Sequence, residues 1–288
     1  MARELTQQIN KSALAKELGI SRSSLYYQPI RPKLDEDLKS QIESVMGDHP
    51  DYGHKRIAIH LKMNKKRVSR VMKKYGLKPY RRRGQSGVKR DDLGNPPAKY
   101  QNLISDLISN LSINRPSQVW AADFTFLRFH RFHEKFIYLA TVIDLYSREI
   151  TGVNLSRFHN RFLVVGAFLD AADKYPLPEI IHSDQGSEYN SREFTHLMDR
   201  YRIKVSMSHK GSPWENGYQE SFFGHFKRYC GDLNRFETIG ELLEEIYHSV
   251  HYYNHDRIHS KLKMPPKEFR MRFYQQTINK PLSKKRGT

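Results

Sequence analysis

Three acidic residues in the middle of the chain have the types and settings needed for metal-assisted chemistry. Asp123 lies in an aromatic stretch, Asp184 follows a short apolar stretch, and Glu220 follows a loop rich in Gly, Pro and Asn. Carboxylate oxygens are the ligands that Mg²⁺ prefers, and two such ions held about 4 Å apart can activate an attacking oxygen and stabilise a leaving one in phosphodiester chemistry. Because a buried carboxylate also serves as a cap or an ion-pair partner, a structural role stays open on this pattern alone.

Alternating strand and helix patterns surround the three acids. The apolar spacing predicts strands at 119–129, 136–146, 148–156, 178–184 and 204–208, and helices at 161–173, about 191–201 and 215–230. In the first strand, one face is expected to carry Trp120, Ala122, Phe124 and Phe126. Asp123 would then point to the opposite face, Asp184 would end a strand and Glu220 would lie on a helix. Three initial strands followed by alternating helices and strands indicate an α/β domain.

The first of two helix-turn-helix patterns lies at residues 11–27. Gly19 sits where a turn must open, Ile20 could anchor that turn, and Ser21 could cap a second helix. That helix would present Arg22, Ser23 and Ser24 to a DNA major groove. A plain helical hairpin has the same short pattern and remains an alternative.

The second pattern lies at residues 52–80. Asn64 is a plausible cap, Gly76 is a plausible stop, and the helix between them has an apolar stripe of Val68, Val71 and Met72. Six basic residues surround this stripe: Lys65, Lys66, Arg67, Arg70, Lys73 and Lys74. We interpret them as phosphate contacts with some base reading, and a charged surface helix is the alternative.

Positive charge is concentrated in the first third of the chain. The net charge is +18, and residues 1–100 hold 23 Lys and Arg against 10 Asp and Glu, whereas residues 101–230 hold 15 against 14. Residues 81–99 combine Gly, Pro and charge as a linker does, and they include Arg81, Arg82 and Arg83, which could follow a phosphate backbone. This asymmetry favours a polyanionic partner, although a solvated basic face would also produce it.

Composition excludes several classes of protein. No stretch approaches the ~18 apolar residues of a membrane span, no secretion signal is visible, and an aromatic content of 12% argues against general disorder. The single cysteine, Cys230, excludes an internal disulfide and a multi-cysteine zinc site. We therefore expect a soluble protein of a reducing compartment.

Four separate motifs, in order, point to a known family. They are WAADFT, IIHSDQGSEY, SPWENGYQESFFGHFK and YYNHDRIHSKLKMPPKEF, and 35 residues (185–219) separate Asp184 from Glu220. The chain resembles the second-frame transposase of IS3-type bacterial insertion sequences, which are members of the retroviral-integrase-like DDE superfamily. The resemblance covers about residues 115–270, and residues 38–95 resemble the helix-turn-helix region that precedes the core in this family.

The resemblance implies a fold and a division of the chain. The fold would be α/β, with an RNase H-like catalytic core built on a mixed five-stranded sheet with flanking helices and preceded by all-α helix-turn-helix DNA-binding units. The expected divisions are an N-terminal helix-turn-helix, a second helix-turn-helix domain, a basic linker with a connecting helix, the catalytic core, and a C-terminal helical extension with a tail, at residues 1–34, 35–80, 81–114, 115–230 and 231–288.

The resemblance also implies roles for individual residues. Asp123, Asp184 and Glu220 match the three acidic positions that hold two Mg²⁺ ions, for which Mn²⁺ can substitute. Lys227, two helical turns after Glu220, matches a basic residue that approaches DNA. Residues that flank the metal site in the family motifs, with less definite roles, are His182, Gln185, Gly186, His209, Asn216, Asn254, Arg257 and His259. A zinc site built from His248, His251, His255 and His259 is imaginable but is not favoured, because no cysteine lies nearby.

The implied function is transposition. The chain would bind the terminal inverted repeats of its element, hydrolyse a phosphodiester to free a 3′-hydroxyl, and direct that hydroxyl at a phosphodiester of target DNA. We expect a homo-oligomer on DNA, possible pairing with the upstream-frame product, and a cytoplasmic, nucleoid-associated location in a bacterium. A DNA-binding regulator with an inactive core and a nonspecific RNase H-like nuclease are the alternatives. The first would need no carboxylate triad, and the second would need no helix-turn-helix units.

Overall fold

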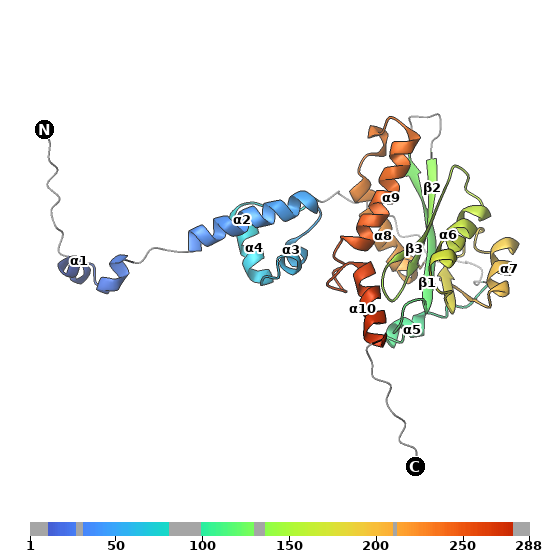
Figure 1. The fold of residues 1–288 in the computed structure, drawn as a ribbon, viewed down its shortest axis with the longest axis horizontal. Coiled ribbons are helices and arrows are strands. Elements are labelled where there is room, and N and C mark those ends of the chain that lie inside the picture. Colours follow the sequence, from blue (N-terminus) through green and yellow to red (C-terminus); the bar gives the residue numbers. More distant parts are fainter. Residues whose placement is uncertain (1–10, 27–30, 81–98, 130–135, 210–211, 279–288) are drawn as a thin grey trace, which may run out of the picture. The chain divides into compact units, whose positions relative to one another are not determined.

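The computed structural model describes residues 11–26, 31–80, 99–129, 136–209 and 212–278 of the 288-residue chain. The chain divides into two units, Met1–Tyr80 and Arg81–Thr288, which Figure 1 draws as ribbons. Arg81, Arg82, Arg83 and the rest of the predicted linker up to residue 98 lie outside the described residues. None of the described helices has the length and apolar character needed to cross a membrane.

The first predicted helix-turn-helix is matched only in part. Helix α1 (Lys11–Glu17) is followed by Gly19, whose φ of 64° opens the turn as expected. The expected second helix is instead η1 (Arg22–Tyr26), a 3-10 helix of five residues. The prediction that Ile20 anchors the turn is wrong, because its side chain is exposed. The serine hydroxyls of this segment bond to each other and to a nearby backbone N–H, which favours a short turn over a longer helix.

The second helix-turn-helix pattern forms a three-helix unit. It consists of α2 (Arg31–Asp48), α3 (His54–His60) and α4 (Lys65–Lys74), and α4 packs against both other helices. Asn64 caps α4 as predicted, since its side chain accepts a hydrogen bond from the Lys66 N–H at 2.8 Å. The predicted apolar stripe of α4 is buried. Helix α2 runs across the predicted division at residue 34, because residues 31–48 form one continuous helix.

The second unit is built on a five-stranded sheet. Its strands are β1 (Val119–Arg128), β2 (Phe136–Asp144), β3 (Ile150–Ser156), β4 (Ile180–Ser183) and β5 (Lys204–Met207), in the spatial order β3-β2-β1-β4-β5. The first three strands form an antiparallel meander, whereas β4 and β5 run parallel to β1. The sheet is therefore mixed, as predicted.

Helices cover both faces of this sheet (Figure 1). One face packs against α6 (Arg161–Lys174) and α7 (Arg192–Arg200), and the other against α8 (Gly217–Cys230) and α9 (Ile239–His255). The remaining helices are α5 (Ser105–Ser109), η2 (Pro213–Asn216), η3 (Leu233–Arg235) and α10 (Pro266–Ile278). This three-layer α/β arrangement is the RNase H-like fold expected from the sequence.

Alternation along β1 decides which way its side chains point. Trp120, Ala122 and Phe124 belong to the core beneath α6 and α7, so Asp123 points towards the α8 side, as predicted. Phe126 departs from the expectation that it shares this core, because its ring is exposed and instead contacts Phe136 edge-on. It lies near the end of the strand, two residues before Arg128.

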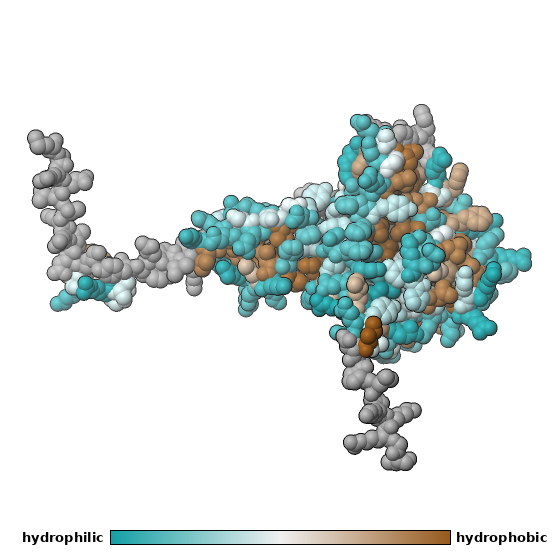
Figure 2. Space-filling model, viewed as in Figure 1, coloured by the Kyte–Doolittle hydropathy of each residue, from teal (hydrophilic) through white to brown (hydrophobic). Residues whose placement is uncertain are grey.

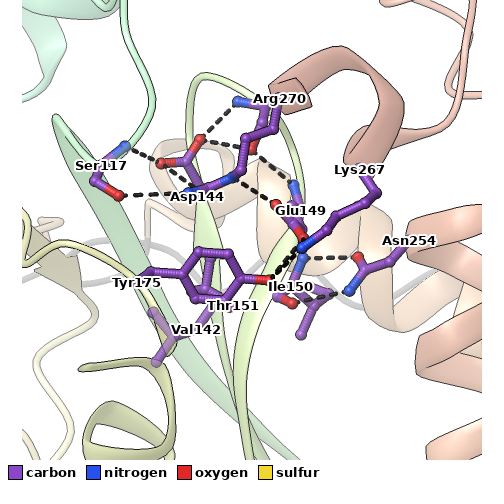
Figure 3. A network of polar contacts seen from close by, with 11 residues as sticks. Ser117, Val142, Asp144, Glu149, Ile150, Thr151, Tyr175, Asn254, Lys267 and Arg270 are labelled. Carbon is purple, nitrogen blue, oxygen red and sulfur yellow. Dashed lines mark hydrogen bonds and ion pairs between the residues drawn. The ribbon is translucent and has the colours of Figure 1, made fainter. Parts of the chain in front are cut away.

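Two cations of α10 complete the core at the turn between β2 and β3 (Figure 3). Arg270 lies 2.5 Å from Glu149 and 3.4 Å from Asp144, and all three side chains are buried. Lys267 lies 3.0 Å from Glu149, which also accepts a hydrogen bond from the Tyr175 hydroxyl at 2.7 Å. Asp144 accepts further bonds from two backbone N–H groups. The C-terminal extension therefore neutralises two buried carboxylates of the sheet.

The face of the protein shown in Figure 2 is largely polar. Hydrophilic side chains cover most of the face visible in Figure 2, with apolar side chains showing between them. This matches the charged fraction of 28% in the sequence.

Candidate active site

The register of β1 with β4 brings two of the predicted catalytic acids to the same place in the sheet. The last paired residues of these parallel strands are Ala121 and His182. Two residues further along each chain stand Asp123 and Asp184, so the two carboxylates leave neighbouring strands at one level. Across the antiparallel neighbour β2, Asp123 faces Thr141. The two acids therefore lie just beyond the last β1–β4 pair, where β4 ends and β1 continues to Arg128.

A tight turn shapes the backbone at Asp184. The Gly186 N–H donates to Asp184 Oδ1 at 2.9 Å. A Cβ atom at position 186 would lie 2.9 Å from that same oxygen and 3.0 Å from a carboxylate oxygen of Glu188. Glycine therefore leaves room for two closely spaced carboxylates, which gives the predicted supporting residue Gly186 a steric reason.

The third acid, Glu220, lies in the first turn of α8 and is exposed. The residue before it, Gln219, is fully buried and connects α8 to the sheet. Its Nε2 donates to the carbonyl oxygens of Ala121, at 2.7 Å, and Thr141, at 3.1 Å. Its Oε1 accepts from the Thr141 hydroxyl at 3.0 Å. The start of α8 is thus held on both strands beside Asp123.

The three carboxylates influence one another electrostatically. Burial raises the pKa of Asp123 to about 7, and the negative charges of Asp184 and Glu220 act in the same direction. The hydrogen bond from the Phe124 N–H opposes this rise. Burial also raises the pKa of Asp184. In both acids burial disfavours the ionised form, and a bound cation would favour it.

The charges of Asp123 and Asp184 also affect the pKa of Tyr189. Burial, followed by the charges of Asp123, Asp184 and Glu188, raises the pKa of the Tyr189 hydroxyl well above its ordinary value. Tyr189 is fully buried against Phe194. It therefore stays neutral, and it adds no further negative charge to the acidic cluster.

Lys227 lies on the same side of α8 as Glu220. Its ammonium group is 5.3 Å from the centre of the Phe126 ring, and its charge lowers the pKa of Asp123. Its side chain is half-buried. The predicted DNA-contacting lysine is therefore within electrostatic range of the first acid.

The chemistry of the donor set fits a hard divalent cation. The acids are oxygen donors, and a bound cation would remove the mutual repulsion that helps to raise the pKa of Asp123. Within the described ranges, however, no three His, Cys, Asp or Glu side chains already form a group that could hold a metal ion. The acids share one region without being preassembled as a three-ligand site.

Among the predicted supporting residues, His182 and Gln185 have structural contacts. His182 is fully buried, its Nδ1 lies 2.9 Å from the Ser206 hydroxyl, and burial lowers its pKa to about 4. It is therefore a neutral ring inside the sheet. The Gln185 amide donates to the Ser208 carbonyl at 3.1 Å and so ties the Asp184 turn to the end of β5.

His209 and Asn216 belong to the approach to α8. Glu215 holds His209 through its backbone N–H, at 2.7 Å, and through Nδ1, at 3.0 Å. Asn216 precedes α8 but its side chain makes no capping hydrogen bond, and it is buried. Asn216 lies three residues before Gln219, and His209 is bound to Glu215 of η2. Both residues therefore belong to the segment that precedes Glu220.

Asn254, Arg257 and His259 contact other parts of the second unit. Both polar atoms of the buried Asn254 amide bond to the backbone of Ile150, each at 2.9 Å. Buried Arg257 donates to Nδ1 of His225 on α8 at 3.0 Å. The His259 N–H donates to the Met264 carbonyl at 3.1 Å. Through these contacts, the three residues hold the C-terminal extension in place within the second unit.

The predicted DNA-binding residues of the helical unit fall into two sets. All of them are exposed at the surface, and the first set consists of Arg22, Ser23, Ser24, Lys65, Lys66, Arg67 and Lys73. Arg70 and Lys74, by contrast, form ion pairs with Asp35 of α2 at 2.6 and 3.0 Å. These hydrogen bonds hold the pKa of Asp35 well below its usual range. Part of the basic surface of α4 therefore stabilises its own unit.

Sequence reasoning missed Gln219 and Thr141. A signal for Gln219 was present, because the buried positions of α8 are Gln219, Phe222, Phe223, Phe226 and Cys230. A glutamine that opens such an apolar helical stripe must find hydrogen-bond partners inside the protein. Thr141 had no comparable signal, since a threonine in an apolar strand is common.

Comparison with known proteins places the chain in a family. Two models, each described as an integrase core domain, match residues 113–213 and 201–266. The chain is 30% identical to the putative transposase InsK for insertion sequence element IS150 of Escherichia coli K12, over 94% of this chain and 97% of that protein. It is 33% identical to the transposase for insertion sequence element IS904 of Lactococcus lactis, over 85% and 98%. InsF, the transposase for insertion sequence IS3A of Escherichia coli K12, is 30% identical over 76% and 78%.

Solved structures with similar folds are more distant. The catalytic core domain of HTLV-2 integrase in complex with magnesium is 20% identical and covers 54% of this chain and 97% of that chain, with a TM-score of 0.45. A chain of the simian T-cell lymphotropic virus intasome is 14% identical and covers 80% and 74%, with a TM-score of 0.48. The assignment therefore depends on the sequence relatives and the integrase core match. The chain belongs to the IS3 family of insertion-sequence transposases, which have an integrase-like core and cleave and transfer DNA strands.

Proposed function

We propose that Asp123, Asp184 and Glu220 form the catalytic centre of this transposase and hold two Mg²⁺ ions, for which Mn²⁺ can substitute. The observation that carries the proposal is the junction of β1, β4 and α8. Continuing the β1–β4 register brings Asp123 level with Asp184, and Gln219 fixes the start of α8 beside Asp123. The influence of Asp184 and Glu220 on the pKa of Asp123 supports their proximity.

Each acid has a distinct part in this proposal. Asp123, in the middle of a strand, provides the fixed ligand, and Asp184 provides a second one on a turn that glycine allows to be tight. Glu220, exposed on α8, completes the donor set from the other side. When bound, the ions would activate the attacking oxygen and stabilise the leaving oxygen of a phosphodiester.

The reaction that follows from family membership has two steps. Hydrolysis at an element end breaks the bond between phosphorus and the 3′ oxygen and leaves a free 3′-hydroxyl. That hydroxyl then attacks a phosphorus atom in target DNA, and the leaving group is the 3′ oxygen of the target strand. No side chain forms a covalent bond with DNA in either step. Lys227, beside Phe126 and the first acid, is suited to hold a phosphate of the reacting strand.

Recognition of element ends is assigned to the helical unit. The exposed cations of α4 and the residues of η1 are the proposed contacts with the terminal inverted repeats. Because two ends must be held at once, we expect a dimer or a larger assembly on DNA. The upstream-frame product is a further possible partner in that assembly.

Substitution of the acids tests the catalytic assignment. Asp123→Asn, Asp184→Asn and Glu220→Gln are each expected to lower cleavage and joining of an element-end duplex in Mg²⁺ by about 10²-fold or more, the scale for losing one electrostatic catalytic group. The matched control is Glu193→Gln, which removes an exposed acid of α7 paired with Arg161. The assignment is wrong if Asp184→Asn cleaves at the rate of the control.

The choice of DNA separates this function from its alternatives. A transposase joins a duplex that carries the terminal repeat and leaves a scrambled duplex unjoined. Equal cleavage of both duplexes without joining would indicate a nonspecific nuclease. Binding to the repeat with no reaction in Mg²⁺ or Mn²⁺ would indicate a regulator with an inactive core.

A further inference from the structure

The buried amide of Gln219 occupies an unusual position for a polar side chain. It begins the apolar stripe of α8 and is fully buried, and its three hydrogen bonds all go to residues next to Asp123. Ala121 precedes Asp123 by two residues on β1, so both point to the same face. Thr141 is the residue that faces Asp123 from β2. One amide therefore links α8 to both sides of the first acid.

Within the described residues, Gln219 provides the side-chain hydrogen bonds that join the start of α8 to the sheet. Asn216, at the N-cap position, makes no side-chain capping bond. The glycine that follows it has no heavy atom within 4 Å of where a Cβ would stand. Tyr218 is partly buried against the core on this side of the sheet, and the buried Phe222 and Phe223 follow two and three residues beyond Glu220. The Gln219 amide is thus the polar contact that sets the position of the first turn of the helix.

This anchoring has a direct consequence for Glu220. Glu220 is exposed and makes no hydrogen bond among those found in the described residues, whereas its neighbour has a fixed place on the sheet. A shift of the first turn of α8 would move the Glu220 backbone relative to Asp123. Outer residues that orient metal ligands typically change metal affinity by about 10–100-fold when they are lost.

We propose that Gln219 is a positioning residue that holds Glu220 at the correct distance from Asp123 by joining α8 to β1 and β2. This inference rests on the proposed function, because it assigns Gln219 a role through Glu220. The polar atoms of Gln219 are directed at Ala121 and Thr141 in the sheet, so its proposed role is indirect. Its loss would therefore raise the Mg²⁺ concentration that the enzyme requires, beyond any effect on folding.

The test uses Gln219→Met in the full chain. Methionine has a similar length and is apolar, so it keeps the packing of α8 but makes none of the three bonds. The half-maximal Mg²⁺ concentration is measured in two ways: by the Mg²⁺-induced rise in melting temperature and by cleavage of an element-end duplex. We expect both values to increase about tenfold or more, and we expect Mn²⁺ to restore part of the cleavage rate.

Asn154→Leu is the matched control. The Asn154 amide also ties the first turn of a helix to the sheet, because it donates to the carbonyl oxygens of Phe162 and Leu163 on α6. It lies on β3, at the far side of β2 from Asp123. Its loss should lower the melting temperature but leave the half-maximal Mg²⁺ concentration unchanged. A purely structural role for Gln219 would make the two variants behave alike, and that result would overturn the proposal.

Two further variants keep the outcomes distinct. If Gln219→Met does not fold, Thr141→Val removes only the hydroxyl bond to Oε1, and a Mg²⁺ requirement equal to that of wild type would overturn the proposal. Glu220→Gln serves as the reference for the proposed function. If it binds Mg²⁺ and cleaves as wild type does, the catalytic assignment fails and the role of Gln219 fails with it. If Glu220→Gln is impaired and Gln219→Met is not, only the positioning role fails.

Discussion

Two groups of acids in the second unit differ in the positive charge that surrounds them. Asp144 and Glu149, at the turn between β2 and β3, are buried against Arg270, Lys267 and backbone N–H groups. Among the predicted catalytic acids, Asp123 has one cation, Lys227, among the influences on its pKa, and that pKa still rises to about 7. The first group is neutralised within the protein, and the second remains short of positive charge.

Burial alone does not distinguish the two groups. Asp144 and Asp123 both belong to strands of the same meander, and both are shielded from water to a large degree. What distinguishes them is the presence of a matching cation. A cluster of acids that the protein leaves uncompensated is a candidate for an external cation.

Breaking the compensated group should have the largest effect on stability. Arg270→Met leaves the buried carboxylates of Asp144 and Glu149 without their shared guanidinium. Removing one partner from a buried ionic group costs about 3–5 kcal/mol. Chemical denaturation followed by tryptophan fluorescence should show this loss in the second unit, because Trp120 is buried there.

The matched control for that variant is Arg272→Met, on the same helix. Arg272 pairs with Glu268 at the surface, where an ion pair contributes about 0–1 kcal/mol. Equal stabilities of the Arg270 and Arg272 variants would contradict the view that α10 completes the core.

The raised pKa of Asp123 should make the stability of the second unit depend on pH. Because the pKa of Asp123 is raised from 3.8 to about 7, its neutral form favours folding. This contribution is fully present below pH 3.8 and is lost as pH rises through about 7. In Mg²⁺ the direction reverses, because metal binding requires the ionised acid. The Mg²⁺-induced rise in melting temperature should therefore grow between pH 6 and 8.

The Asp123→Asn variant isolates this dependence. Its melting temperature in Mg²⁺-free buffer should fall less than that of wild type between pH 5 and 8, and added Mg²⁺ should have little effect on it. Parallel pH profiles for wild type and variant would show that another group titrates in this range.

In the helical unit, the same comparison can be made between two basic residues, one paired with an acid and one not, within the described residues. The expected change, in DNA affinity, is the smallest of the expected effects. Arg67 and Arg70 are both exposed, but Arg70 is also paired with Asp35. We expect Arg67→Ala to weaken binding of duplex DNA several-fold and to reduce the slope of log affinity against log salt by about 1. Arg70→Ala should lower the melting temperature of this unit and change the salt slope less. Fluorescence anisotropy across salt concentrations distinguishes the two, and equal slope changes would contradict the division.

Much of the core could be predicted from the sequence because its strands and helices have strong apolar periods. The order of elements from β1 to α8 is as expected, and Asn64 caps α4. Short-range rules were weaker in the first helix-turn-helix, where Ile20 is exposed and η1 replaces a longer helix. Few apolar residues are available there to bury, so tertiary packing does not extend the helix.

Contacts between distant segments could not be predicted from spacing alone. Nothing near Asp144 indicates that its partner would be Arg270, because the two are 126 positions apart. The same limit applies to Gln219, whose bonds reach back to Ala121 and Thr141. For the acids, the sequence identified Asp123, Asp184 and Glu220 as candidates, and the fold supplied the strand register that makes two of them neighbours.

The amide of Asn254 has a consequence for how copies of the protein can meet. It bonds to both the N–H and the carbonyl of Ile150, the first residue of β3, which is the outermost strand on its side of the sheet. An unprotected edge strand presents unpaired N–H and C=O groups to any extended peptide, and two such edges can pair to join their sheets. The Asn254 amide occupies both backbone groups of Ile150, as a neighbouring strand would, and so protects the start of the β3 edge. An extended peptide, including a strand of a second copy, is thereby kept from pairing with the sheet at Ile150.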